Sequence, residues 1–189
     1  MSPSYHHGNL RRAVMDAAVT AIEESGPSGW SLRELARRAG VSHAAPAHHF
    51  GDKAGLLTAI AAEGFDLLSE ALTGAGDDLL DLGVAYVRFA VRHRAYFEVM
   101  FRPELYRTGD PDLAAARVRT RELLERAVRP LSPDPESALA AWSIAHGFAG
   151  LWLSGALPTG AGSDPEAAAR PVLAKLFALQ IPGEPAPRA

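Results

Sequence analysis

The chain has 189 residues, of which 48% are hydrophobic and 22% are charged, and its formal net charge is −3. This composition is typical of a globular protein that buries a core, and the length allows one domain or a small domain fused to a larger one. The absence of cysteine excludes disulfides and cysteine-ligated zinc and fits a reducing cytoplasm. No charged segment leads into an apolar one at the N-terminus, so we expect no secretory signal.

The first predicted helix lies near the N-terminus. Its apolar residues recur every three or four positions and form a single stripe of Leu10, Val14, Ala18, Ala21 and Ile22. Gly26 and Pro27 follow, and neither residue favours continuation of a helix. The pattern therefore predicts an amphipathic helix that ends at this pair.

A second, short helix follows. Ser31 and Glu34 form an S-x-x-E capping box, in which each side chain can bond a free amide of the first turn. Trp30 and Leu35 flank this cap at the positions of a hydrophobic staple. Gly40 then stands where a left-handed residue is needed to end the helix, so we expect a sharp turn there.

A third short helix is predicted after this turn. Val41 can fill the angle between the two helices, and Ser42 can cap the new one. Two short helices joined by a glycine turn form a helix-turn-helix, whose second helix lies in the major groove of DNA. Because alanines and a glycine turn suit any close-packed helix pair, a small helical hairpin is the alternative interpretation.

A fourth, long helix is predicted to begin at Asp52 and Lys53. Asp52 can cap it, and Lys53 would be its first residue. A lysine there adds a full charge to the free amides and the positive end of the helix dipole, a combination that suits a DNA phosphate. The apolar pattern continues to Leu72 before Gly74 and Gly76, so the helix is long enough to connect a DNA-binding head to a body.

Together these motifs resemble the tetracycline-repressor (TetR) family of bacterial transcriptional regulators. The resemblance rests on YHHGNLRRAVMDAA, SLRELARRAGVSHAAP and HHFGDKAGLL, which keep the family's order and spacing over roughly residues 5 to 60. It implies a mostly helical C-terminal domain that dimerises and usually binds a small effector. Ala47 departs from the family pattern, since members commonly carry a phosphate-contacting tyrosine there. One expected backbone contact is therefore missing.

The predicted DNA contacts divide by their position on the motif. Residues at the front of the second motif helix face base edges, and residues at its borders reach phosphates. The base-facing candidates are His43, Ala44, Ala47 and His48. The phosphate candidates are Ser31, Arg33, Ser42, His49 and Lys53. The net charge is only +1 through residue 57, so this prediction rests on motif geometry rather than on a basic patch.

Beyond the fourth helix, proline marks the helix starts. Asp110, Asp134 and Asp164 each precede a proline and read as a cap followed by the first helical residue. The predicted helices lie near 77–93, 94–106 (broken at Pro103), 111–129, 135–157 and 165–180. Within them, RHRAYFEVMFRPELY and AWSIAHGFAGLW resemble the effector domain of a TetR subgroup named for a Trp-His-Gly signature.

The segment between Glu136 and Asp164 contains no charged residue. Its apolar part is long enough to raise the alternative of a membrane-spanning helix. It also contains serines, a histidine and glycines, and its larger residues are phased, which favours a helix buried by its own subunit and by a partner. We therefore predict a four-helix dimer interface formed by the last two helices. Its residues are Ala149, Trp152, Leu153, Ala156, Leu173, Leu176 and Phe177.

Aromatic residues concentrate in the predicted body helices, where most must form plain core. A ligand pocket needs apolar walls with a few converging polar groups. The predicted ligand-binding residues are Tyr86, Phe89, His93, Tyr96, Met100, Trp142 and His146. For His146, a core histidine bonded to a backbone carbonyl is an equally good interpretation.

Neither a metal site nor an active site is indicated. The adjacent His48 and His49 point about a third of a turn apart on a helix, so one ion cannot easily bridge them. The chain has no G-x-S-x-G, glycine-rich phosphate loop, H-E-x-x-H or cysteine nucleophile. We therefore predict no metal, no cofactor and no enzymatic activity.

We predict an all-α protein of about nine helices with a three-helix DNA-binding head on a larger helical domain for effector binding and dimerisation. The expected boundaries are residues 1–52 for the head, 53–181 for the body and 182–189 for a disordered tail. The function expected is that of a cytoplasmic transcriptional regulator, usually a repressor, which binds a palindromic operator as a homodimer and is released by a small apolar effector. A helical ligand- or protein-binding module that has lost operator binding is the alternative.

Overall fold

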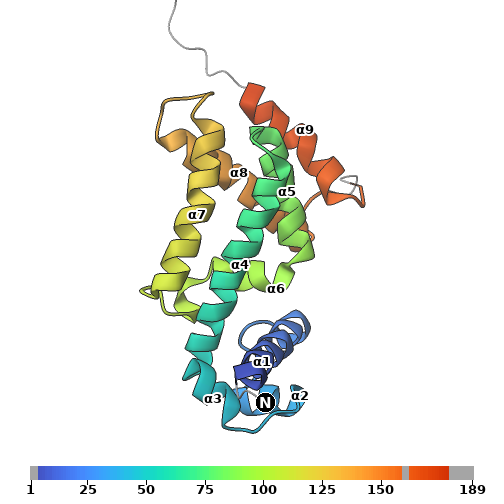
Figure 1. Ribbon diagram of the computed structural model, residues 1–189. Helices are drawn as coiled ribbons and strands as arrows, with labels where there is room; N and C mark the ends of the chain where they lie inside the picture. The colour runs from blue at the N-terminus through green and yellow to red at the C-terminus, as the bar shows by residue number, and fades with distance from the viewer. Residues whose placement is uncertain (1–3, 159–161, 179–189) are drawn as a thin grey trace, which may run out of the picture. The chain divides into compact units, whose positions relative to one another are not determined.

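The computed structural model describes the backbone of residues 4–158 and 162–178, and the side chains of residues 10–158 and 162–175. Every regular element in these ranges is a helix, which confirms the all-α prediction (Figure 1). The α-helices are α1 Ser4–Ser25, α2 Leu32–Arg38, α3 Ala45–Phe50, α4 Lys53–Ala75, α5 Leu79–Arg92, α6 Arg94–Met100, α7 Pro111–Val128, α8 Glu136–Leu153 and α9 Pro165–Ala178, and a 3₁₀ helix, η1, spans Pro103–Leu105.

The chain forms two compact units. Of the described residues, the first unit contains those through 71 together with 92–123, and the second contains 72–91 together with 124–158 and 162–178. Most of α4 and all of α6 thus lie in the same unit as the three N-terminal helices. The predicted tail, 182–189, lies outside the described residues.

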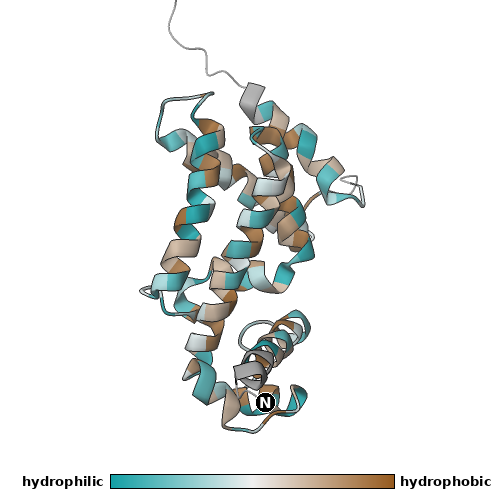
Figure 2. Ribbon diagram, in the orientation of Figure 1, coloured by the Kyte–Doolittle hydropathy of each residue, from teal (hydrophilic) through white to brown (hydrophobic). Residues whose placement is uncertain are grey.

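The core of the first unit confirms the stripe predicted for α1. Val14, Ala18 and Ile22 are at most 1% exposed, and α1 packs against α2, α3 and α6. Figure 2 shows hydrophilic as well as hydrophobic residues along α1, as an amphipathic helix requires. Burying this stripe against other helices stabilises a helix far more than its intrinsic propensity does.

The turn between α2 and α3 is formed as predicted. Gly40 has a φ of +65°, in the left-handed region that glycine adopts without steric cost. The Gly40 amide donates to the Arg37 carbonyl at 3.3 Å, and the Val41 amide donates to the Ala36 carbonyl at 3.0 Å. These two bonds make a Schellman motif, which satisfies the last carbonyls of α2 and turns the chain toward α3.

Three of the four aspartate caps predicted from the sequence are confirmed, those formed by Asp52, Asp110 and Asp164. Asp52 Oδ1 accepts from the Gly55 amide at 2.9 Å, and Asp110 Oδ1 accepts from the Leu113 amide at 3.0 Å. Asp134 and Asp164 accept from the amides two residues ahead, each at 2.9 Å. Aspartate followed by proline therefore located the starts of α7 and α9, whereas α8 begins one residue later than predicted, at Glu136, with Pro135 at the N-cap position.

In the second unit, α8 packs against α9 and ends earlier than predicted. The prediction extended the helix to residue 157, but the last helical residue is Leu153. Gly155 has a φ of +69°, and the Ala156 amide donates to the Leu151 carbonyl at 3.0 Å. A second Schellman motif thus ends α8 before its apolar sequence ends.

None of the helices in the described parts of the chain is long and apolar enough to span a membrane. The membrane-spanning alternative for the uncharged segment is therefore not supported by the described residues.

Candidate nucleic-acid interface

The short helix α3 separates its packing residues from its outward-facing residues. Ala45, Pro46 and Phe50 are all buried, and they anchor the helix. The four predicted base-facing side chains are all exposed, and we call this set the reading face: His43 and Ala44, which directly precede the helix, and Ala47 and His48, which lie on it. A helix held on one side and bare on the other can enter a groove without disturbing the core.

The start of α3 corrects one prediction. Ser42 was expected to cap the helix, but Ala44 occupies the N-cap position and makes no side-chain cap bond. The Ala45 amide donates to the Ser42 carbonyl at 3.0 Å, so Ser42 belongs to the preceding turn. Pro46 accounts for the shift, because proline is tolerated in the first turn of a helix but costs a hydrogen bond further in.

The N-terminus of α2 carries two of the predicted phosphate contacts. Ser31 Oγ accepts from the Glu34 amide at 3.3 Å, which confirms one half of the capping box. The carboxylate of Glu34 pairs with Arg38 at 2.7 Å, so its partner is a side chain of the next turn. Ser31 and Arg33 are both exposed at this end of α2.

Lys53 is folded back on the chain rather than extended. Its ammonium donates to the carbonyls of Trp30 at 2.9 Å and Ser28 at 3.2 Å, and it lies 3.9 Å from the centre of the Trp30 ring. Burial lowers the pKa of Lys53. A cation over an indole with two carbonyl partners ties the first residue of α4 to the segment that leads into α2. The ammonium therefore already has a structural role, and these two carbonyls accept two of its three N–H groups.

Two arginines that the sequence did not single out lie at the corner between α3 and α4. The guanidinium of Arg11, on α1, lies 5.3 Å from the centre of the Phe50 ring. Arg107 Nη2, from the segment before α7, donates to Asp52 Oδ2 at 2.9 Å. The Gly55 amide bond and then the Arg107 guanidinium hold the pKa of Asp52 below its usual range. Arg11 lay within a recognised motif, whereas nothing in the sequence placed Arg107 near the helix-turn-helix.

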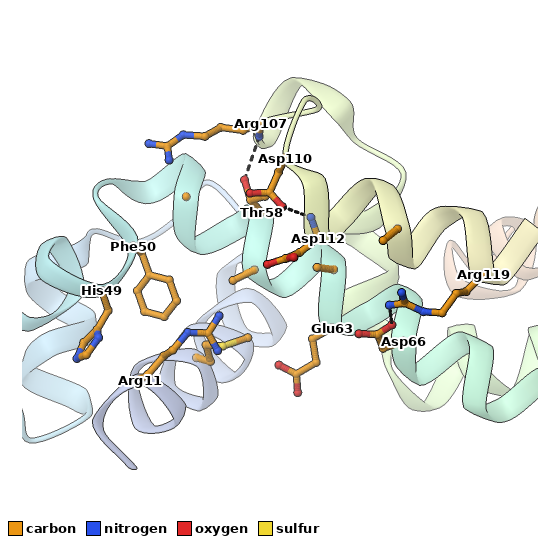
Figure 3. Close-up of a pocket in the computed structure, with 15 residues that line it drawn as sticks. Arg11, His49, Phe50, Thr58, Glu63, Asp66, Arg107, Asp110, Asp112 and Arg119 are labelled. Carbon is orange, nitrogen blue, oxygen red and sulfur yellow. Dashed lines mark hydrogen bonds and ion pairs between the residues drawn. The ribbon is translucent and has the colours of Figure 1, made fainter. Parts of the chain in front are cut away.

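A hollow of about 660 Å³ opens beside this corner within the first unit (Figure 3). One face of α4 lines it with small residues, among them Gly55, Ala59 and Ala62. His49, which is half-buried, and Phe50 line the end nearest α3. Charged residues of both signs complete the wall: Arg11, Glu63, Asp66, Arg107, Asp110, Asp112 and Arg119.

Three of the predicted ligand-binding residues meet in the second unit, and we call Tyr86, Trp142 and His146 the aromatic cluster. The Tyr86 hydroxyl is 2.8 Å from His146 Nδ1 and accepts from Trp142 Nε1 at 3.2 Å. Burial raises the pKa of Tyr86 and lowers that of His146, so it favours the neutral form of both groups. Because Trp142 donates to the hydroxyl oxygen, the hydroxyl proton is available for His146 Nδ1.

The remaining ligand-binding candidates are divided between the two units. Phe89 is 1% exposed in the second unit, whereas His93, Tyr96 and Met100 belong to the first. The Tyr96 hydroxyl donates to Glu63 at 3.2 Å, and burial followed by the nearby Glu63 charge raises its pKa to about 12. The Tyr96 ring also lies edge-on to His93, with 6.1 Å between ring centres.

The side chains predicted to form a dimer interface differ in exposure. Ala149 and Leu173 are at most 1% exposed, so they face the core of their own unit and offer no side-chain surface to a partner. Trp152 and Leu153 are half-buried, and Ala156 is exposed. The side chains of Leu176 and Phe177 lie outside the described residues. Among the described side chains of α8 and α9, the large exposed apolar residues are Leu139, Trp142, Leu151 and Val172.

Two family descriptions match this chain. Residues 14–60 match the family described as bacterial regulatory proteins, tetR family. Residues 79–176 match the family described as tetracyclin repressor-like, C-terminal domain, and this match takes in more than half of the chain.

The chain is also similar to individual proteins and solved structures. The chain is 31% identical over 166 residues to the HTH-type transcriptional regulator BetI of Stenotrophomonas maltophilia strain R551-3, a match covering 79% of this chain and 83% of that protein. A structure of a protein of unknown function from Rhodococcus sp. RHA1 has 32% identity and a TM-score of 0.75, covering 94% of this chain and 98% of that one. The crystal structure of AibR in complex with isovaleryl coenzyme A and operator DNA has 22% identity and a TM-score of 0.64, covering 89% and 98%, and so shares the fold.

Proposed function

The chain belongs to the TetR family of transcriptional regulators, with a helix-turn-helix DNA-binding domain, and from this premise we propose that it is a repressor. It binds a palindromic operator as a homodimer, in the cytoplasm, and a small apolar effector releases it. The observation that carries this proposal is the exposed reading face of α3, which is supported by a buried opposite side.

The reading face supplies the proposed base contacts. Alanine can contact a thymine methyl group, as Ala44 and Ala47 would, and the histidines offer a donor or an acceptor to purine edges. The proposed phosphate contacts are Ser31, Arg33, Ser42, His49 and Lys53. Phosphate contacts fix the register of the protein on the duplex, whereas the reading face selects which DNA sequence is bound.

The exposed apolar side of α8 supports dimerisation. Leu139 and Leu151 are 58% and 48% exposed, and Val172 on α9 is 43% exposed. Large apolar side chains exposed on two packed helices are typical of a surface that a partner covers. We propose these residues, with Trp152, Leu153 and Ala156, as the interface. In a homodimer, the two reading faces would meet major grooves roughly 34–36 Å apart, or a multiple of that distance.

The aromatic cluster supports an effector site in the second unit. It places three polar atoms among aromatic rings, which is the usual make-up of a site for a mostly apolar ligand. AibR, which shares the fold, is described in complex with isovaleryl coenzyme A, and this supports a small organic effector. The subgroup named for its Trp-His-Gly signature is part of the same proposal, since Trp142, His146 and Gly147 carry it. Effector and operator binding would be reciprocally coupled, typically by about 1–3 kcal/mol.

A mobility-shift experiment with the full chain and the DNA upstream of its own gene tests this function. We expect a shifted complex that weakens as salt rises, a footprint with two-fold symmetry, and loss of the complex when a suitable effector is added. If the chain leaves this DNA unshifted even at low salt, the regulator proposal fails. The alternative of a ligand- or protein-binding module without operator binding would then be preferred.

A further inference from the structure

We propose that Arg107, which lies far beyond the helix-turn-helix in sequence, is a further contact to the DNA backbone. This inference rests on the proposed operator binding, because it adds one phosphate contact to each bound head. Arg107 belongs to the first compact unit together with the three N-terminal helices.

The position of the guanidinium is the first support. Arg107 Nη2 bonds Asp52 at 2.9 Å, and it would lie 3.6 Å from a Cβ atom built on Gly51. Gly51 is the residue directly after α3, so the guanidinium lies against the corner where the reading helix ends. In Figure 3 the Arg107 side chain extends from its loop toward the segment that carries His49 and Phe50.

The backbone of Arg107 is held in place while its side chain is exposed. Its amide donates to Thr58 Oγ1 at 3.0 Å, and Thr58 is only 4% exposed on α4. The Tyr106 hydroxyl, next in the chain, donates to the Met100 carbonyl at 2.8 Å. The Arg107 side chain is nevertheless 54% exposed. With the backbone anchored, only the side chain has to be ordered when the guanidinium meets a phosphate.

The charge arrangement explains why an arginine is needed at this corner. The Asp52 carboxylate caps α4 and by itself would repel a phosphate that approaches the end of α3. Arg107 offsets that charge with one N–H group, and its remaining donors can bond phosphate oxygens in the same plane. Arg11 brings a second guanidinium to Phe50, and both arginines line the same hollow.

The chain offers a matched control in the pair of Arg119 and Asp66. This pair also joins an arginine of the α7 region to an aspartate of α4, and its side chains are 53% and 49% exposed. Asp66 lies thirteen residues after Lys53, the first residue of α4, which places it about 20 Å along the helix axis from that end. We therefore expect no contact between Arg119 and a duplex bound at α3.

The experiment measures binding of the full chain to two probes as a function of salt. One probe is a duplex selected by this protein from a random-sequence pool, and the other is sheared genomic DNA. We expect Arg107→Ala to weaken binding at least about tenfold and to lower the slope of log K against log salt by about 0.9 for each bound head. We expect Arg119→Ala to leave both quantities unchanged, and Arg107→Lys, which keeps the charge, to retain most of the slope.

A double-mutant cycle with Asp52→Asn separates a phosphate contact from a merely structural link. Asparagine caps a helix as well as aspartate does, so α4 keeps its start. If Arg107 contacts DNA, Arg107→Ala lowers the salt slope in the Asp52→Asn background as well. If Arg107 only holds Asp52, the second substitution has no further effect in that background, and the inference is overturned.

The outcomes also distinguish this inference from the proposed function. A wild-type chain that binds neither probe refutes operator binding, and the Arg107 contact with it. A wild-type chain that binds, with an unchanged slope for Arg107→Ala, refutes the Arg107 contact alone. Circular dichroism and thermal melting of each variant confirm that a changed slope comes from a folded protein.

Discussion

The reading face of α3 and the aromatic cluster of the second unit hold their candidate residues in opposite ways. On α3 the proposed base-reading side chains are exposed, and different residues, such as Phe50, do the packing. In the cluster, Tyr86, Trp142 and His146 hydrogen-bond one another and are also part of the packing. Function and stability should therefore be separable at the reading face and coupled in the cluster.

The largest effect is expected from removing the packing side of α3. Phe50 is 7% exposed, and Phe50→Ala deletes an aromatic side chain from the support of the reading face. Truncations of this kind cost about 3–5 kcal/mol because a cavity remains. Urea unfolding followed by circular dichroism measures the loss. A cost below about 1 kcal/mol would show that Phe50 does not anchor α3.

A smaller effect on stability is expected in the aromatic cluster. Tyr86→Phe removes the hydroxyl that bonds both Trp142 and His146, and two lost hydrogen bonds correspond to about 1–3 kcal/mol. The same variant should change effector affinity, since the hydroxyl is one of the proposed polar contacts. Paired unfolding and ligand-titration measurements test the coupling. A change in stability alone, or in effector affinity alone, would contradict the proposed coupling of function and stability in the aromatic cluster.

Lys53 lies between these two cases, since it is proposed to contact phosphate and is also bonded within the chain. Lys53→Ala loses a cation–π contact and two carbonyl bonds, and a cation–π contact of this kind contributes about 0.5–2 kcal/mol. It should also weaken all operators alike and lower the salt slope by about one unit. Unchanged affinity and slope together with reduced stability would assign Lys53 a structural role only.

The pH dependence of stability tests the state of His146. Burial lowers the pKa of this side chain below its ordinary value of 6.5, so the folded chain favours the neutral ring. The neutral ring therefore contributes to the stability of the fold above pH 6.5. This contribution is lost as the pH falls through the lower pKa of the folded state, because the unfolded chain binds the proton more readily. The free energy of unfolding in urea should therefore change more between about pH 7.5 and about pH 5 for the wild type than for His146→Gln. Equal differences would mean that His146 is not held neutral.

The smallest effect on stability is expected on the reading face itself. His43→Ala and His48→Ala change exposed side chains, so the free energy of unfolding should change by less than about 0.5 kcal/mol. Each variant should nevertheless change which operator sequences bind, and selection from a random-sequence pool measures this. Destabilisation without altered sequence preference would reverse the assignment of these residues.

Much of the fold could be predicted because its signals are local. Gly40, Asp110 and Asp164 act within four residues of their own positions, and each forms the cap or turn that its sequence predicts. The start of α3 was predicted too early because two local signals compete there. Ser42 can cap a helix, but Pro46 is best placed in a first turn, and the structure follows Pro46.

Contacts between distant segments were not predictable in this way. The bond of Arg107 to Asp52 joins residues 55 positions apart, and the folded-back Lys53 bonds carbonyls more than twenty positions away. The burial of Ala149 and Leu173 likewise depends on which sides of α8 and α9 pack against the rest of the second unit. A helical period shows that a helix has an apolar side but does not indicate which other segment will cover that side.

The sequence by itself determined the all-α class, the caps of α4, α7 and α9, the glycine turn and the resemblance to a regulator family, because these depend on neighbouring residues. Only the tertiary structure decided that Lys53 is folded back, that Arg107 reaches the end of the reading helix, and that Tyr86 and His146 share a hydrogen bond. Such contacts join segments that are distant along the chain, and their geometry exists only after the helices have packed.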